Sequence, residues 1–168
     1  MTSVTRKLES TPTHRWLALA AWVALCMAVG LVSGFLFKPD AWFAALEKPF
    51  FNPPSWLFAP VWTTLYVAMG VAAWRIWCQP ATVARTQALR QFCIQLALNA
   101  AWTPVFFGAH ALAGGLVVIV LMWIAIAFTI RRFHCLDKIA AWLLVPYLAW
   151  VSFATLLNVA LLALNGKF

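Results

Sequence analysis

The sequence predicts an all-α integral membrane protein, a bundle of five transmembrane helices. Of its 168 residues, 65% are hydrophobic and only 10% are charged, whereas a soluble domain carries about 25% charged residues. The apolar residues form five continuous runs and do not alternate with polar ones, a pattern that favours helices over a β-barrel. Because no soluble segment of domain size separates the runs, residues 1–168 are expected to form one domain.

Each apolar run is long enough, or nearly so, to cross a membrane. About 20 residues in a helix span ~30 Å of hydrocarbon. The first run is too long for the apolar part of a signal peptide and lacks a convincing cleavage site, so we count it as a helix. The five runs cover about residues 16–37, 56–78, 89–107, 111–130 and 139–164.

The connections between the runs differ in kind. Residues 79–88 are polar and predict a mobile surface loop, and residues 131–138 form a short basic link. Gly108, Ala109 and His110 leave room only for a tight turn, which makes the third and fourth helices antiparallel neighbours.

The basic residues predict the orientation. Nine of the 12 Lys and Arg residues lie on the side that holds the N-terminus and three on the other. The positive-inside rule then places the N-terminus in the cytoplasm if the membrane is a plasma membrane. Although the net charge is +8, its location beside the helix ends indicates contact with the lipid bilayer and argues against a nucleic-acid partner.

No catalytic or metal-binding cluster is visible. The runs contain no Asp or Glu, which weakens an ion-coupled transporter and removes paired-carboxylate chemistry. His14 and His134 lie at one face and His110 at the other, without the grouping that a metal needs. A single histidine as an axial haem ligand is the less favoured alternative. The four cysteines have no C-x-x-C spacing and are interpreted as reduced thiols.

The connection spanning residues 38–62 is unusually aromatic and rich in proline, which restricts its backbone. A rigid aromatic loop can fold back over the helix ends as a lid. A lid implies a ligand site beneath it, and Trp42 and Phe51 are the loop residues that we expect to contact the ligand.

Polar and aromatic side chains recur every three or four residues in the second, third and fifth runs, so they share one face of each helix. A polar group in hydrocarbon costs free energy unless it finds a partner, so these faces should point inward. They either join the helices by hydrogen bonds or line a cavity. The residues are Trp62, Tyr66, Gln95, Asn99, Trp102, Trp150, Ala154 and Asn158.

The 11 tryptophans favour the cavity. Flat indole faces suit a large, planar, apolar ligand, and amides with a Tyr hydroxyl would fix its polar edge. A tetrapyrrole fits this description, and a sterol fits it in part. Two patterns of small residues, Gly30 with Gly34 and Ala97 with Ala101, predict close helix packing, one within the bundle and the other at a dimer interface.

Several motifs follow one another in a specific order. They are KPDAW (38–42), KP (48–49), NPPSW (52–56), PVWTTLY (60–66), QLALN (95–99), WTPVFFG (102–108), PYLAW (146–150), FAT (153–155) and LN (157–158). With these motifs, the chain resembles the TspO/translocator protein family, once called the peripheral-type benzodiazepine receptor, over about residues 16–165. The residues of its motifs are closer to those of the bacterial members than to those of the animal ones, and the resemblance therefore implies a bacterial membrane.

The resemblance implies a five-helix homodimer with a ligand site near the first loop. It implies binding of porphyrins such as protoporphyrin IX and haem, and of isoquinoline-carboxamide and benzodiazepine drugs, with no cofactor required. Trp62 and Trp150 match pocket tryptophans to which light-dependent porphyrin breakdown has been ascribed, and they are the catalytic residues if there are any. The other matching pocket positions are Tyr66, Gln95, Asn99, Trp102 and Ala154.

Two departures from the family pattern matter. Many members carry Trp where this chain has Phe50 or Phe51. Val159 and Ala163 stand where the sterol-recognition pattern of animal members needs Tyr and Arg, which makes cholesterol a doubtful ligand. Three functions remain open from the sequence: a tetrapyrrole receptor acting in regulation or stress response, a light-dependent porphyrin-degrading protein, and a transporter of porphyrin or lipid-like cargo.

Overall fold

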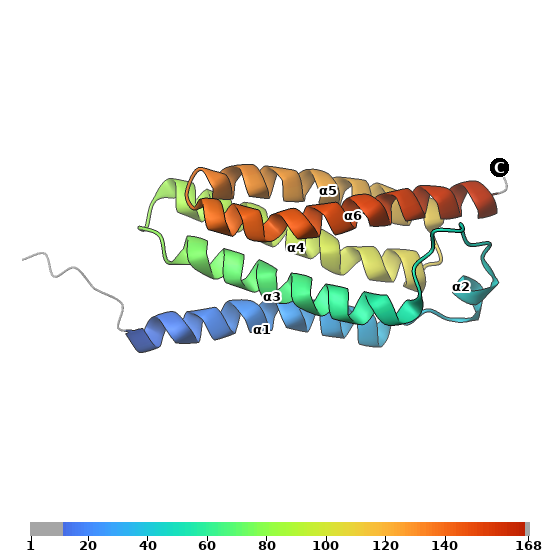
Figure 1. Cartoon of the computed structure of the whole chain (residues 1–168), viewed down its shortest axis with the longest axis horizontal. Helices are drawn as coiled ribbons and strands as arrows, with labels where there is room; N and C mark the ends of the chain where they lie inside the picture. The colour runs from blue at the N-terminus through green and yellow to red at the C-terminus, as the bar shows by residue number, and fades with distance from the viewer. Residues whose placement is uncertain (1–11, 167–168) are drawn as a thin grey trace, which may run out of the picture.

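The computed structural model describes residues 12–166 and shows five long helices packed side by side, with one short helix in the connection after the first (Figure 1). Adjoining turns extend two of them: a 3-10 turn at Ser55–Leu57 leads into α3, and a π turn at Pro104–Gly108 follows α4. The helices are α1 (Pro12–Leu36), α2 (Ala41–Ala45), α3 (Phe58–Trp77), α4 (Val83–Thr103), α5 (Leu112–His134) and α6 (Lys138–Asn165).

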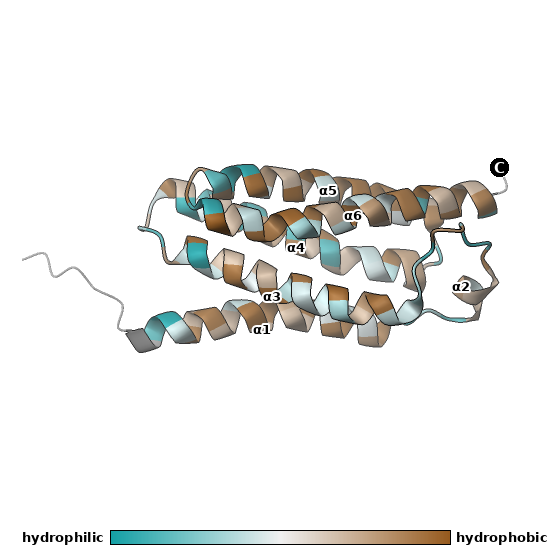
Figure 2. Ribbon diagram, viewed as in Figure 1, coloured by the Kyte–Doolittle hydropathy of each residue, from teal (hydrophilic) through white to brown (hydrophobic). Residues whose placement is uncertain are grey.

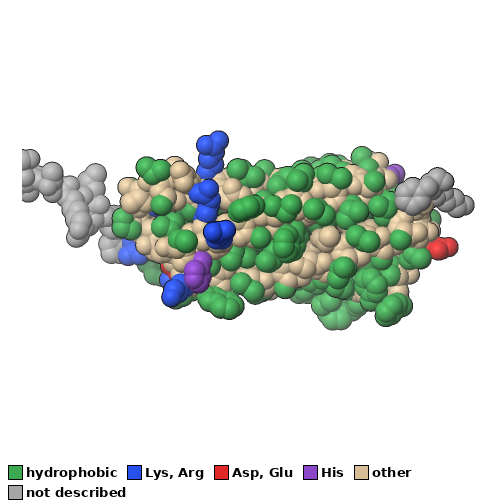
Figure 3. Space-filling view, turned by 90° about the horizontal axis from the view of Figure 1, so that it is seen from above, with side chains coloured by type: hydrophobic (Ala, Val, Ile, Leu, Met, Phe, Trp, Pro, Cys, Tyr) green, Lys and Arg blue, Asp and Glu red, His purple; other side chains and the backbone are tan. Residues whose placement is uncertain are grey.

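The bundle is that of an integral membrane protein, as predicted. In the described part of the chain, α1, α3, α5 and α6 are each long and apolar enough to cross a membrane. The more polar α4 is as long and packs mainly against α5. Hydrophobic side chains cover the visible face along its length, while Lys and Arg side chains gather near one end (Figure 3). We call the end that carries α2 the outer end and the opposite one the inner end, and the helices are more hydrophilic toward the inner end (Figure 2).

The core is densest in the inner half of the bundle. Met69, Ile76, Phe92 and Phe133 are fully buried there, and the rings of Phe92 and Phe133 stack with centroids 6.0 Å apart. A second, smaller cluster at the outer end joins Phe106 of the π turn to two leucines of α6 and to aromatic residues of α2. The space between the two clusters is where the candidate site lies.

The prediction of a mobile loop at residues 79–88 was wrong, because α4 begins at Val83. The Thr82 hydroxyl accepts a hydrogen bond from the Arg85 N–H at 3.2 Å and caps the helix. The Arg85 guanidinium also donates to the carbonyls of Trp77 and Gln79, each at 3.1 Å. The apolar run begins only at about residue 89, but the helix begins earlier, at Val83. The residues between include Ala, Arg and Gln, which favour helix whether or not the segment is apolar. For the same reason α5 continues to His134, into the segment predicted as a basic link.

Within the predicted lid, residues 41–45 form the short helix α2, which was not predicted from the sequence. The Asp40 carboxylate accepts a hydrogen bond from the Phe43 N–H at 3.1 Å and caps this helix. A single helical turn carries no periodic pattern, so only the capping aspartate signalled it.

At the inner end, an ion pair joins α3 to the start of α6: Arg75, near the end of α3, lies 2.8 Å from Asp137, just before α6. The same carboxylate caps α6 by accepting from the N–H groups of Ile139 at 2.8 Å and Ala140 at 3.1 Å. Burial alone would raise the pKa of Asp137, but the hydrogen bond from Ala140 and the Arg75 guanidinium outweigh it and hold the pKa below its ordinary value of 3.8. The pair therefore stays charged well into acidic pH.

Two glycines of different helices let α1 and α3 approach closely. A Cβ on Gly70 would lie 2.6 Å from the Cα of Val23, and one on Gly30 would collide with the ring of Tyr66. At Gly34, one turn beyond Gly30, an added Cβ would meet no atom within 4 Å. The two helices are therefore in contact from the inner end as far as Gly30, and space opens beside α1 at Gly34.

Because Gly70 and Gly34 differ in the space around them, their substitution by Ala should affect stability differently. Gly70→Ala should push α1 away from α3 and destabilise the detergent-solubilised protein by about 1–3 kcal/mol, the usual cost of overpacking. Gly34→Ala is the matched control and should leave the midpoint of thermal unfolding unchanged or slightly raised, since Ala favours helix over Gly. Equal losses of stability in the two variants would contradict this account of the α1–α3 contact.

Candidate ligand-binding site

A cavity of about 910 Å³ lies in the outer half of the bundle. Its wall comes from all five long helices and from the connection that contains α2. Gly34 and Phe35 of α1 and Ala59 and Thr63 of α3 line the cavity and are also exposed, so it opens between these two helices. The volume lies within the ~300–1,000 Å³ of typical small-molecule pockets.

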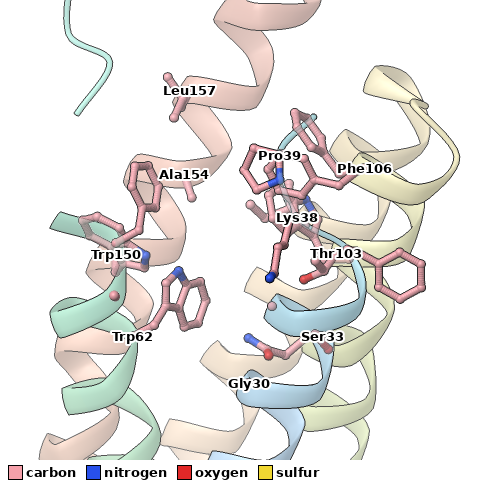
Figure 4. A pocket seen from close by; sticks show the side chains of 18 of the residues that line it. Gly30, Ser33, Lys38, Pro39, Trp62, Thr103, Phe106, Trp150, Ala154 and Leu157 are labelled. Atoms are coloured by element: carbon pink, nitrogen blue, oxygen red, sulfur yellow. The ribbon is translucent and has the colours of Figure 1, made fainter. Parts of the chain in front are cut away.

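Three indoles lie in the wall, among several Phe rings. Trp62 comes from α3, Trp102 from α4 and Trp150 from α6, and Figure 4 shows the first and last on one side of the hollow. Each is supported by another ring: Trp62 stacks on Tyr66 with centroids 5.3 Å apart, Trp102 on Phe106 at 4.9 Å, and Trp150 meets Phe58 edge-on at 5.8 Å. The indoles are thus held in place before any ligand arrives.

The floor of the cavity is a buried hydrogen-bonded group. The Tyr66 hydroxyl donates to the Asn99 Oδ1 at 2.7 Å, and the Asn99 Nδ2 donates to the Tyr147 hydroxyl at 3.0 Å. These three residues join α3, α4 and α6 and are called the triad below. Tyr66 and Asn99 reach the cavity wall, whereas Tyr147 lies beneath it and is fully buried.

Some buried polar atoms in the described part of the chain have no partner. The Trp102 Nε1 and the Asn158 Oδ1 are two of them, and both residues line the cavity. Gln95 is also buried without a partner for either amide atom, but it does not line the cavity. An unpaired buried polar atom costs free energy, so a ligand that supplies an acceptor for Trp102 and a donor for Asn158 would gain by relieving that cost.

The connection after α1 is attached to the outer end of the bundle at two points. The Asn165 side chain of α6 accepts from the Glu47 N–H at 2.8 Å and donates to the Glu47 carbonyl at 2.9 Å. On the other side His110 stacks on Trp42 with centroids 4.4 Å apart and contacts the Asp40 carboxylate at 2.9 Å. The hydrogen bond from Phe43 and the contact with His110 hold the pKa of Asp40 below its ordinary value.

The structure places seven of the ten residues expected at the ligand in the cavity wall: Trp62, Tyr66, Asn99, Trp102, Trp150, Ala154 and Asn158. The other three lie outside it. Trp42 packs on His110 and Phe106, Phe51 packs on Phe153, and Gln95 lies one helical turn deeper than Asn99. Contact of any of the ten with a ligand stays a prediction.

Several residues of the wall were not predicted from the sequence. Phe106 was quoted only as part of a motif, and Ser33 and Thr103 had no periodic polar pattern to single them out. Lys38 and Lys48 were noted as basic residues near a helix end, and both line the cavity. Both lysines lie within residues 38–62, the predicted lid, and that position was the signal for them.

Fold and site together define an integral membrane protein of five spanning helices with an aromatic cavity near one membrane face. Residues 22–164 match the TspO/MBR family, and the chain belongs to that family. It is 45% identical over 155 residues to the tryptophan-rich protein TspO of Chlorobaculum tepidum, covering 89% of this chain and 96% of that protein. It is 42% identical over 150 residues to the tryptophan-rich sensory protein of Cereibacter sphaeroides, covering 89% and 92%. The human translocator protein is 43% identical over 119 residues, 70% of each chain.

If the triad holds α3, α4 and α6 together, substitutions in it should destabilise the fold. Asn99→Ala should lower the free energy of unfolding by about 1–3 kcal/mol, because two tyrosine hydroxyls then lose their partner in a buried site. Tyr147→Phe removes one hydrogen bond and should cost less, about 0.6 kcal/mol as for other interhelical bonds in membranes. Thermal or denaturant unfolding in detergent gives both values. An Asn99→Ala variant as stable as the parent would show that the triad does not hold the helices.

Proposed function

We propose that this protein binds a tetrapyrrole such as protoporphyrin IX or haem in the cavity, as a receptor in tetrapyrrole regulation or stress response. The observation that carries the proposal is a cavity of about 910 Å³ whose wall combines three indoles with unpartnered polar atoms of Trp102 and Asn158. Indole faces favour a flat aromatic macrocycle, and the unpartnered atoms favour one with polar groups at its edge.

One of the relatives supports the receptor role. It is named a tryptophan-rich sensory protein, whereas the name translocator protein of others fits the transporter alternative. Membership of the family extends the proposal to isoquinoline-carboxamide and benzodiazepine drugs as competing ligands and to a homodimer as the working form. The exposed apolar face of α1, which includes Leu31 and Phe35, leaves room for a second copy.

Light-dependent porphyrin breakdown is the second candidate. The observation in its favour is that the indoles of Trp62 and Trp150 both line the cavity and would contact a bound macrocycle. Porphyrin absorbance followed in light and in the dark separates this activity from binding alone. Loss of absorbance in the light that persists in a Trp62→Phe, Trp150→Phe double variant would be photobleaching without participation of the protein.

The test of the binding proposal is to fill the cavity. Ala154 lines it, whereas Ala149 on the same helix is exposed. Ala154→Phe should raise the apparent Kd for protoporphyrin IX, measured by quenching of tryptophan fluorescence, at least tenfold. The new ring would occupy the volume that the macrocycle needs. Ala149→Phe is the matched control and should bind like the parent.

Thermal unfolding of both variants checks that the fold survives. A folded Ala154→Phe protein that binds protoporphyrin IX as tightly as the parent would show that the ligand does not enter this cavity. Absence of saturable quenching in the parent protein would overturn the proposed function itself.

A further inference from the structure

We propose that the Lys38 ammonium binds a carboxylate of the ligand, so that the cavity selects a planar amphiphile with an anionic edge and fixes which edge faces the outer end. This inference rests on the proposed tetrapyrrole function. It adds the residue that determines specificity for the acid over a neutral analogue, and the orientation of the bound molecule.

Lys38 lies at the outer end of the cavity, just beyond α1. It follows α1 by two residues and lines the cavity. Figure 4 shows its ammonium reaching down into the hollow, across from Trp62. The Nζ lies 4.8 Å from the centroid of the Phe35 ring, a cation–π contact that steadies the side chain. Among the described residues, this ammonium has neither a hydrogen-bond acceptor nor a carboxylate partner.

Lys48, the other lysine of the wall, is engaged differently. Its ammonium donates to the carbonyls of Phe43 at 2.9 Å, Ala44 at 3.0 Å and Leu46 at 3.1 Å. An ammonium has three N–H donors, so these three bonds use all of them. Lys48 therefore closes the end of α2, while Lys38 keeps its donors for a ligand.

The acids at the outer end do not neutralise the cavity. Asp40 and Glu47 are exposed, and neither lines the wall. The Asp40 carboxylate already accepts from the Phe43 N–H and contacts His110. The charged groups of the cavity wall are therefore cations, and an anion entering it meets no carboxylate there.

The ligand's own chemistry then sets its orientation. A carboxylate is costly to place deep in an apolar site. Among the described residues of the wall, the rim at Lys38 offers it nearby water and a cation whose donors are not already used, unlike those of Lys48. A charge-assisted hydrogen bond is stronger than a neutral one, and partial exclusion of water by the cavity strengthens it further. The apolar part of the macrocycle would then extend toward Trp62, Trp150 and the triad.

The experiment compares protoporphyrin IX with its neutral dimethyl ester, by tryptophan quenching in a detergent with an uncharged head group. The parent should bind the acid about tenfold more tightly than the ester, a typical effect of one charge-assisted contact. Lys38→Gln should remove this preference, so that the acid and the ester bind with similar affinity. Lys38→Arg should retain it. Lys138→Gln, the same chemical change at an exposed site at the inner end, is the matched control and should behave like the parent.

The outcomes separate this inference from the function on which it rests. A preference for the acid that survives in Lys38→Gln, or no preference in a parent protein that binds both porphyrins, would overturn the role of Lys38 while leaving tetrapyrrole binding intact. A parent protein that binds neither porphyrin would overturn both. Because the ester serves as an internal reference, a general loss of folding in a variant is recognised by loss of both ligands.

Discussion

The hydrogen-bonded triad of Tyr66, Asn99 and Tyr147 is the interaction on which the geometry of the site depends. Inside a membrane, helices gain little by burying apolar side chains, because lipid is as apolar as the core. Polar side chains that need partners therefore set the register of one helix against the next. The triad does this for α3, α4 and α6 at one level of the bundle.

The register of these three helices also fixes the positions of the three indoles. Trp62 precedes Tyr66 by four residues on a helix that runs inward, while Trp102 follows Asn99 by three and Trp150 follows Tyr147 by three on helices that run outward. Each indole consequently lies about one turn, or ~5 Å, on the outer side of its triad member. Three tryptophans distant in sequence therefore lie at a similar height along the bundle, and all three line the cavity. The loop with α2, attached through Asn165 and His110, closes its outer end.

Helix number and inward faces were predictable because they follow from local patterns. Gln95 and Asn99 recur at helical spacing on α4, as Asn158 does with Trp150 and Ala154 on α6, and all three polar residues are buried as expected. The position of each residue along the helix axis, relative to the cavity, was not predictable. Gln95 and Asn99 share a face of α4, yet only Asn99 reaches the cavity. The same pattern that placed them on one side of α4 says nothing of where the floor of a cavity lies.

The details of the outer end were beyond the reach of local patterns for another reason. The Glu47–Asn165 contact joins residues 118 positions apart, and nothing near Glu47 signals it. Lys38 and Lys48 are equivalent in the sequence, two lysines each followed by proline. Only the fold shows that the Lys48 ammonium donates to two carbonyls of α2 and to that of Leu46, and that the Lys38 ammonium is available.

The central claim is that a planar ligand lies inside the bundle, between the indoles and above the triad. An experimental structure of the protein with protoporphyrin IX tests it most directly. The account predicts density for the macrocycle in the cavity, in contact with Trp62 and Trp150 and with a carboxylate edge at the outer end. A macrocycle bound to the lipid-facing surface, with the cavity filled by the protein's own side chains, would contradict it.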